Sequence, residues 1–334
     1  MALAASTEPL STVYDLAMLD LDGVVYRGKR AVPQAVEAIG AVHQAGMATA
    51  YLTNNASRTG GEVAELLRDI GLAAKDDEVV TAGEAIAHIV AESIPPGSKV
   101  LVVGGPGLIV PLERFGLRCV ASADDQPAAV VQGFHPDVGW RSLAEASYAI
   151  EAGVPWFASN ADRTIPTGRG IAPGNGSLIE AVRRATGATP FVAGKPERGL
   201  FDEALRRTGA RRPLMVGDRL DTDISGALNC GIDAMHVLTG ISDLSDVVAA
   251  PARERPHYVA PDLRALGQAH PPVEVSEHRS VCAGAVAEID ATQLELTAGS
   301  RGSLEATRAV VALAWAWRDS AGQVPRLTAS ALGH

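Results

Sequence analysis

Short apolar runs alternate with segments of helical periodicity along residues 12–265 of the chain. The apolar runs have the length and the β-branched content of buried strands. In the segments between them, apolar residues recur every three or four positions, as Val36, Ile39 and Val42 do before Gly46. A glycine at that place is typical of a helix C-terminus. This alternation predicts an α/β fold with a Rossmann-like parallel sheet.

A break in the pattern at Pro95–Ser98 separates a first set of elements from a second one. After about residue 188 the first pattern resumes, so we expect one core domain that is interrupted by an inserted domain. The predicted segments are a first part of the core (1–97), an inserted α/β domain (98–188) and a second part of the core (189–271).

The remaining segment, residues 272–334, forms a C-terminal extension in this interpretation. Residues 273–277 and 293–299 alternate in strand fashion, and a helix with Leu304 and Trp315 on one face follows. The extension is therefore expected to be a small α+β unit that packs on the core or mediates assembly.

Composition excludes several classes of partner. The chain has 334 residues, 29 Lys and Arg against 39 Asp and Glu, and a net charge of −10. Nucleic acids and anionic membranes are bound by clustered cations, so neither is an expected partner. The sequence has no convincing signal peptide and no apolar stretch of membrane-spanning length. Its three cysteines lie far apart, which favours a cytoplasmic protein with reduced thiols.

Polar residues follow four of the predicted core strands, at the ends where open α/β sheets place their ligands. The four elements, in chain order, are Asp20-Leu21-Asp22-Gly23, Thr53-Asn54-Asn55, Gly194-Lys195-Pro196 and the stretch from Asp218 to Asp223. Each element alone is typical of a turn or a helix cap. All four in this order, each after an apolar strand, favour a functional site.

The chemistry of these residue types indicates a phosphate that is bound against a metal ion. Carboxylates from two strand ends would form a hard oxygen site suited to Mg²⁺. A lysine, small polar side chains and the loop amides around Gly23 and Asn54 would bind an anion.

These motifs resemble those of the haloacid dehalogenase (HAD) superfamily. The stretch "DLDGVVYRG" and the insertion between "TNN" and "GKP" resemble its phosphatases with a type-2 (C2) cap, a group that includes NagD-like, p-nitrophenylphosphatase-like and phosphoglycolate-phosphatase-like enzymes. The resemblance covers residues 12–265. It implies a HAD core with an inserted C2 cap.

The resemblance assigns catalytic roles to the first motif. Asp20 matches the nucleophile, which would form an aspartyl-phosphate, and Asp22 matches the general acid and base. Mg²⁺ and Lys195 would offset the charge on the phosphate oxygens. Because Asp22 is present, dehalogenase and ion-pump activities are not expected.

The remaining core residues receive binding roles. The resemblance implies that Gly23, Thr53, Asn54 and Lys195 bind the phosphate. It implies that Asp20, Asp22 and Asp218 bind magnesium. Asn55 and Asp223 would support these residues.

Substrate choice would depend on the cap. In the resembling group a cap loop faces the active site, and here this loop is Ser159–Pro166, with Asp162 and Arg163 as residues that either meet the substrate or form a solvated turn. Further stretches resemble a bacterial subgroup of glycerol-3-phosphate phosphatases with a C-terminal extension. Glycerol 3-phosphate is therefore the expected substrate. Phosphoglycolate, pyridoxal phosphate and nucleoside monophosphates are alternatives, a non-catalytic sugar-phosphate sensor is a rival function, and a homodimer is an assembly left open.

Overall fold

A computed structural model describes residues 2–332, which separate into two compact units. The first unit comprises residues 2–50, 70–72 and 209–332, and the second comprises residues 51–69 and 73–208. The first half of strand β4 belongs to the first unit and its second half to the second. The domain boundaries expected after residues 97, 188 and 271 remain predictions.

The core sheet has six strands in the order β15-β14-β13-β1-β4-β5. Their bounds are β1 (Leu16–Asp20), β4 (Ala48–Thr53), β5 (Val79–Thr81), β13 (Pro213–Gly217), β14 (Asp233–Val237) and β15 (Tyr258–Ala260). Strand β1 pairs in parallel with β13, which pairs in parallel with β14. Because parallel neighbours end at the same edge, the loops after these three strands emerge together.

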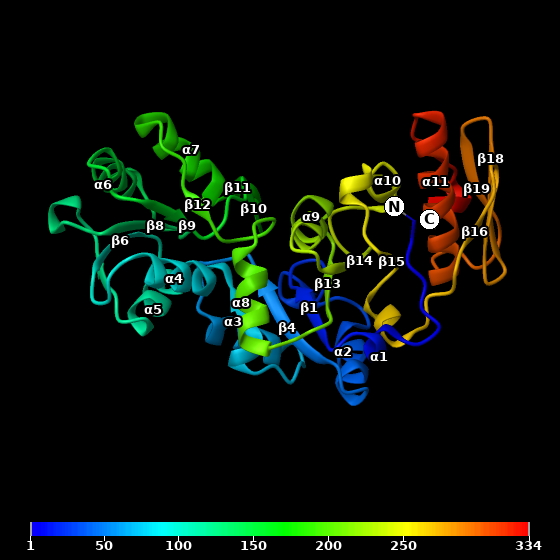
Figure 1. Ribbon diagram of the computed structural model, residues 1–334, viewed down its shortest axis with the longest axis horizontal. Helices are drawn as coiled ribbons and strands as arrows, with labels where there is room; N and C mark the ends of the chain where they lie inside the picture. Colours follow the sequence, from blue (N-terminus) through cyan, green and yellow to red (C-terminus); the bar gives the residue numbers. More distant parts are fainter. Residues whose placement is uncertain (1, 333–334) are drawn as a thin grey trace. The chain divides into compact units, whose positions relative to one another are not determined.

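Helices and short turns of the first unit accompany this sheet (Figure 1). They are α1 (Leu10–Val13), the hairpin β2 (Tyr26–Arg27) and β3 (Arg30–Ala31), α2 (Ala35–Gln44), a π-helical turn η3 (Leu220–Ile224), α9 (Ser225–Asn229), α10 (Leu244–Val248), η4 (Ala252–Glu254) and η5 (Leu263–Gly267). Helix α2 buries Ile39 and Val42, as the periodicity predicts. Gly46 follows it with a φ of 87°, a conformation that ends helices and favours glycine.

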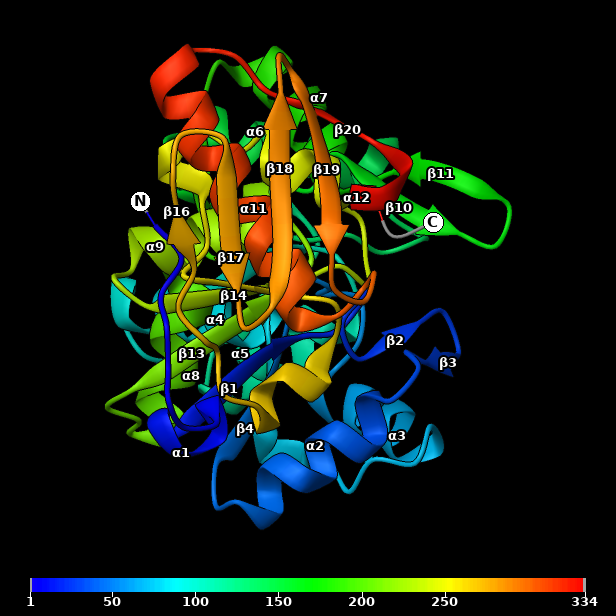
Figure 2. The ribbon, with the colours of Figure 1, turned by 90° about the vertical axis from the view of Figure 1, so that its right-hand side faces the viewer.

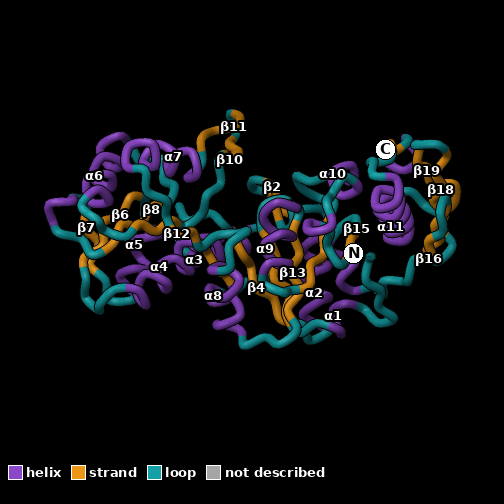
Figure 3. The backbone as a smooth tube through the Cα atoms, turned by 45° about the horizontal axis from the view of Figure 1, so that its top comes forward, coloured by secondary structure: helices purple, strands orange, loops and turns teal. Residues whose placement is uncertain are grey.

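A second parallel sheet forms the centre of the other unit, in the order β12-β9-β8-β6-β7. The strands are β6 (Lys99–Val103), β7 (Arg118–Val120), β8 (Ala129–Gln132), β9 (Trp156–Ala158) and β12 (Phe191–Val192). The helices and turns are α3 (Gly60–Asp69), η1 (Asp76–Glu78), α4 (Ala82–Ser93), α5 (Pro106–Arg114), η2 (Ala123–Asp125), α6 (Trp140–Glu151), α7 (Asn175–Thr186) and α8 (Gly199–Thr208). Helices α6 and α7 cover one face of this sheet, and α4 and α5 lie on the other (Figure 3).

An exposed hairpin interrupts the cap between β9 and α7. Its strands, β10 (Thr164–Thr167) and β11 (Gly170–Pro173), pair antiparallel. No strand is predicted here, because neither segment has a buried face that would give alternation; Ile171 is 74% exposed.

The C-terminal extension is a five-stranded sheet with α11 (Leu304–Ala321) packed against it (Figure 2). Its other elements are β16 (Glu274–Val275), β17 (Arg279–Cys282), β18 (Ala285–Asp290), β19 (Gln293–Ala298), β20 (Arg326–Leu327) and α12 (Ala329–Leu332). All neighbours pair antiparallel except β19 and β20. The expected α/β fold with a parallel core sheet, an inserted α/β cap and a small α+β extension is confirmed.

None of the helices within residues 2–332 combines the length and the apolar character needed to cross a membrane.

Candidate active site

Three aspartates of the first unit converge at the carboxyl edge of the core sheet. Asp20 is the last residue of β1, and Asp218 directly follows β13, its parallel neighbour. Asp223 lies on the π-helical turn that follows. Each residue offers a carboxylate oxygen, and the three oxygens lie within 4.8 Å of one another. The convergence of two strand ends, which the sequence predicts, is therefore present in the structure.

Asp218 is fully buried, and a neighbouring loop orients its carboxylate. The backbone N–H of Ile241 donates a hydrogen bond to Oδ2 at 2.6 Å. Oδ1 is buried and takes part in no hydrogen bond with the described residues. Two glycines pack closely on this group: a Cβ atom on Gly23 would lie 2.5 Å from Oδ2, and one on Gly240 would lie 1.8 Å from it. Only glycine fits at these two positions.

Asp223 shows the same division between its two oxygens. Oδ2 accepts a hydrogen bond from the backbone N–H of Arg219 at 3.1 Å, and Oδ1 is buried without a hydrogen bond to the described residues. Carboxylates whose oxygens lie this close together repel one another unless a cation offsets their charge. The donor set, all hard oxygens, fits a divalent cation such as Mg²⁺ or Ca²⁺.

Asp22 is exposed and occupies a tight turn. The N–H of Gly23 donates to the carbonyl of Tyr26 at 2.8 Å, and Gly23 has a φ of 89°. The carboxylate of Asp22 does not belong to the aspartate cluster found among residues 2–332. A role of Asp22 in metal binding therefore stays a prediction. Its exposure is compatible with proton exchange with water.

The other predicted core residues lie in the second unit, where Asn54 joins two of the motifs. Its Oδ1 accepts the backbone N–H of Lys195 at 2.8 Å, and its Nδ2 donates to the Lys195 carbonyl at 3.0 Å. Thr53 Oγ1 accepts the N–H of Asn55 at 3.1 Å. Lys195 and Thr53 are 4% and 5% exposed. The second and third motifs thus form one connected loop pair, and whether it meets the aspartates around one substrate remains a prediction.

The cap loop also reaches Asn54. Asn54 Nδ2 donates to Asp162 Oδ2 at 3.1 Å, and Asn160 Nδ2 donates to the Asn54 carbonyl at 2.8 Å. Asp162 is therefore next to the predicted phosphate-binding loop. Arg163 is exposed, and its carbonyl accepts a hydrogen bond from Ser177 Oγ at 2.7 Å. Substrate contacts by Asp162 and Arg163 remain predictions.

The sequence-based prediction includes the loop of Asn160 without naming this residue, and it omits a second loop altogether. Asn160 is 4% exposed and links Asn54 to the cap helix α7 through its carbonyl, which accepts from Asn175 Nδ2 at 2.7 Å. The loop Thr239–Ser242 follows β14 and contacts the Asp218 loop. The rule that identified the four motifs could have found this loop as well, because it too follows the carboxyl end of a core strand.

Comparison with known proteins agrees with this geometry. A family model described as haloacid dehalogenase-like hydrolase matches residues 17–118, and a second model, described as HAD-hydrolase-like, matches residues 192–266. A D-glycerol 3-phosphate phosphatase of Mycobacterium tuberculosis is 45% identical over 255 residues, which make up 76% of this chain and 71% of the relative. The chain belongs to the haloacid dehalogenase-like hydrolases.

Two solved structures of the family have the same fold. A glycerol phosphate phosphatase from Mycobacterium tuberculosis in complex with magnesium has a TM-score of 0.84 at 39% identity, and the match covers 96% of this chain and 95% of that one. A 4-nitrophenylphosphatase from Thermotoga maritima has a TM-score of 0.72 at 28% identity, covering 77% and 98%. This haloacid dehalogenase-like hydrolase is thus a phosphatase, a phosphoric monoester hydrolase that acts on small phosphate esters.

Proposed function

We propose that this phosphatase hydrolyses glycerol 3-phosphate to glycerol and phosphate and that it depends on Mg²⁺. The observation that carries the substrate is the 45% identity to a D-glycerol 3-phosphate phosphatase. The 96% coverage by the related glycerol phosphate phosphatase includes most of the C-terminal sheet, so the likeness extends beyond the catalytic core. The magnesium complex of that relative supports Mg²⁺ as the cation for the aspartate cluster.

The proposed metal ligands are Asp20 and Asp218, with Asp223 beside them and Asp22 as predicted from its motif. Bound there, Mg²⁺ would offset negative charge on the phosphate and on the aspartates. Its fit rests on the three carboxylate oxygens within 4.8 Å and on the buried Oδ1 atoms of Asp218 and Asp223.

The proposed chemistry belongs to the first motif. A carboxylate oxygen of Asp20 attacks phosphorus, which forms an aspartyl-phosphate and breaks the bond between phosphorus and the ester oxygen. Asp22 gives a proton to the departing alkoxide and then accepts one from the water that hydrolyses the intermediate. The position of Asp20 in the cluster and the exposure of Asp22 support this division of roles.

The phosphate-binding roles of Gly23, Thr53, Asn54 and Lys195 belong to the same proposal. The hydrogen bonds that hold Lys195 to Asn54 support it, because they fix the lysine backbone next to the second motif. Asn55 would support that loop. Asp162 would act from the cap, and its hydrogen bond to Asn54 supports this role. The proposed substrate contact of Arg163 is supported only by its exposed position on the same loop.

The test is a panel of phosphate esters, ranked by kcat/KM in the presence of Mg²⁺. The panel contains both enantiomers of glycerol 3-phosphate, phosphoglycolate, pyridoxal phosphate and nucleoside monophosphates. We expect one enantiomer of glycerol 3-phosphate to rank first. Another ester in first place would overturn the substrate but keep the phosphatase. No Mg²⁺-dependent phosphate release from any ester would support the sensor instead.

A cytoplasmic location and a homodimer also remain proposals. Free cysteines at Cys119, Cys230 and Cys282 are in keeping with a reducing compartment. A scattering mass of twice 34.6 kDa in solution would support the homodimer.

A further inference from the structure

His236 is a fully buried histidine on β14 whose ring makes one hydrogen bond at the edge of the aspartate site. Its Nε2 lies 3.0 Å from the backbone carbonyl of Ser242. A carbonyl can only accept, so Nε2 carries the hydrogen and Nδ1 bears the lone pair. That Nδ1 is buried and has no hydrogen-bond partner among the described residues. Burial lowers the pKa of His236 to about 4, which keeps the ring neutral and this tautomer in place near neutral pH.

Because Nδ1 accepts no hydrogen bond from residues 2–332, a histidine is unfavourable at this position unless its Nε2–H donor has a role. An acceptor buried without a hydrogen bond destabilises the fold, and an apolar side chain of similar size would avoid that loss. What an apolar side chain cannot provide is the N–H that holds the Ser242 carbonyl. The bond to Ser242 is therefore the physical reason for a histidine here.

Ser242 closes the short loop Thr239–Ser242, which is bonded to both aspartate loops. Thr239 Oγ1 donates to the carbonyl of Gly23 at 2.7 Å. The N–H of Ile241 donates to Oδ2 of Asp218 at 2.6 Å, and the N–H of Ser242 donates to the Asp218 carbonyl at 3.0 Å. One loop thus connects the turn after β1 with the turn after β13.

The position of this loop determines the orientation of the Asp218 carboxylate, because the two pack closely together. A Cβ atom at Gly240 would lie 1.8 Å from Asp218 Oδ2, so the loop backbone lies directly on the carboxylate. The N–H of Ile241 binds Oδ2 and so fixes the rotation of the carboxylate that contributes an oxygen to the cluster with Asp20 and Asp223. Any outward shift of the loop would let the Asp218 carboxylate rotate.

We propose that His236 is a positioning residue for the metal site: through the carbonyl of Ser242 it holds the Thr239–Ser242 loop against Asp218 and so raises the affinity of the aspartate cluster for a divalent cation. This inference rests on the proposed metal role of Asp20, Asp218 and Asp223. Groups that orient metal ligands from behind commonly contribute 10- to 100-fold to metal affinity.

The test compares two substitutions at His236 in the purified full chain after removal of divalent cations. His236→Gln keeps an N–H donor at about the reach of Nε2, whereas His236→Leu fills the space without a donor. Mg²⁺ binding is measured by titration calorimetry, with no substrate present. We expect His236→Leu to raise the Kd for Mg²⁺ about tenfold. His236→Gln should stay within about threefold of the wild type, since it restores the donor.

His270 provides a matched control. It is also fully buried, burial lowers its pKa to about 4 as well, and its Nε2 lies 3.0 Å from the carbonyl of Ala265. Within residues 2–332 its hydrogen bonds go to Ala265, Arg308 and the backbone of Ser6, not to the Thr239–Ser242 loop or the aspartates. His270→Leu should lower the thermal midpoint as His236→Leu does and leave the Kd for Mg²⁺ unchanged.

Three outcomes would overturn the proposal: a wild-type Kd in His236→Leu, a Kd in His236→Gln as weak as that of His236→Leu, or an equal weakening in His270→Leu. If His236→Leu does not fold, Thr239→Val takes its place, because it removes the loop's bond to Gly23 and should raise the Kd about threefold; an unchanged Kd there contradicts the proposal. Asp218→Asn tests the proposed metal site separately from the role of His236. If this variant binds Mg²⁺ like the wild type, the proposed metal site is wrong, and not only the role of His236.

Discussion

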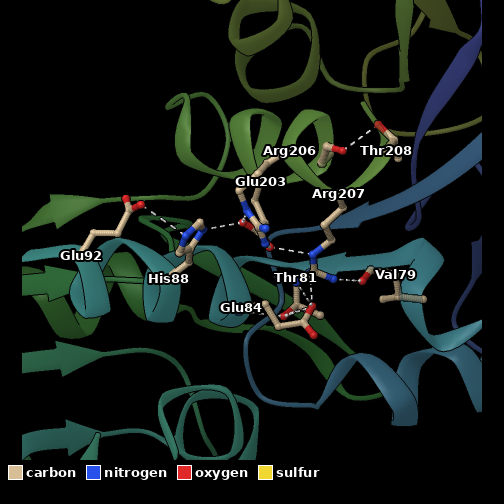
Figure 4. A network of polar contacts seen from close by, with 10 residues as sticks. Val79, Thr81, Glu84, His88, Glu92, Glu203, Arg206, Arg207 and Thr208 are labelled. Atoms are coloured by element: carbon tan, nitrogen blue, oxygen red, sulfur yellow. Dashed lines mark hydrogen bonds and ion pairs between the residues drawn. The ribbon is translucent and has the colours of Figure 1, made fainter. Parts of the chain in front are cut away.

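Among the described residues, each unit has a cluster that includes buried carboxylates, and the two clusters are surrounded differently. In the second unit Glu203, on α8, is 4% exposed and accepts from three neighbours (Figure 4). The donors are His88 Nδ1 at 2.8 Å, Arg206 at 2.7 Å and Arg207 at 2.6 Å. In the first unit Asp20, Asp218 and Asp223 instead bring their own oxygens within 4.8 Å of one another.

The two clusters differ in the groups that surround their carboxylates. Around Glu203 the chain itself supplies guanidinium groups, and Arg207 also donates to the carbonyl of Val79, so the network ties α8 to β5 and α4. Such a network stabilises structure. In the first unit the aspartates gather carboxylate oxygens within 4.8 Å of one another, a set of hard donors that suits a divalent cation. The Glu203 network is therefore structural, and the aspartate cluster is the candidate metal site.

Asp20→Asn should give the largest effect, and it tests the functional half of the comparison. An amide cannot attack phosphorus as a carboxylate does, so phosphate release should fall by about 10⁴-fold or more. Thermal unfolding followed by circular dichroism serves as the control and should show an intact fold. Turnover within tenfold of the wild type would remove Asp20 from the mechanism.

Asp22→Asn should give the next largest effect. The variant loses proton transfer to the leaving group and from water, which is worth about 10² to 10⁴ in kcat. A leaving group that needs no proton, such as p-nitrophenolate, should be less affected than glycerol in the step that forms the aspartyl-phosphate. The rate of this step can be measured by stopped flow as the initial burst of released alcohol or phenol. Equal losses in this rate for both esters would argue against a role of Asp22 as general acid.

Glu203→Gln should lower stability and leave activity intact, the opposite of the two aspartate variants. It leaves Arg206 and Arg207 facing a neutral amide, so the free energy of unfolding should fall by about 2 to 4 kcal/mol. Activity per folded molecule at 25 °C should stay within about twofold of the wild type, because the network belongs to the second unit and the aspartates of the site belong to the first. Chemical denaturation and steady-state kinetics on the same sample measure both. A loss of activity without a loss of stability would break the comparison.

The smallest expected effect is a pH dependence of the stability that Glu203 contributes. Burial alone would raise the pKa of Glu203, but hydrogen bonds from Arg206, Arg207 and His88 outweigh it and place the pKa below its ordinary 4.5. A carboxyl with a lowered pKa stabilises the fold fully above pH 4.5, and this contribution is lost as the pH falls through the folded pKa. The gap in thermal midpoint between wild type and Glu203→Gln should therefore narrow below pH 4.5. A constant gap from pH 7 to pH 3 would contradict this.

Side-chain periodicity and strand ends were the features that the sequence could predict. Ile39 and Val42 are buried as their spacing requires, and Asp20 and Asp218 meet because parallel neighbours end together. These are local rules, and they need only the order of residues.

Contacts between distant segments and contacts of the backbone could not be predicted. Asn54 bonds to Lys195 across 141 positions, which no local pattern specifies. The N–H of Ile241 orients Asp218, and a backbone donor has no residue identity to reveal it. The sequence does not predict strand β18, because alanine, which has weak strand preference, occupies two of its first three positions.

Magnesium binding to a matched pair of variants tests the central claim most directly. Asp218→Asn and Glu203→Gln each turn one buried carboxylate into an amide, in the site and in the structural network respectively. Titration calorimetry with Mg²⁺ on the full chain should show a Kd at least about 100-fold weaker for Asp218→Asn and within about threefold of the wild type for Glu203→Gln. Wild-type binding by Asp218→Asn, or lost binding in a folded Glu203→Gln, would contradict the account.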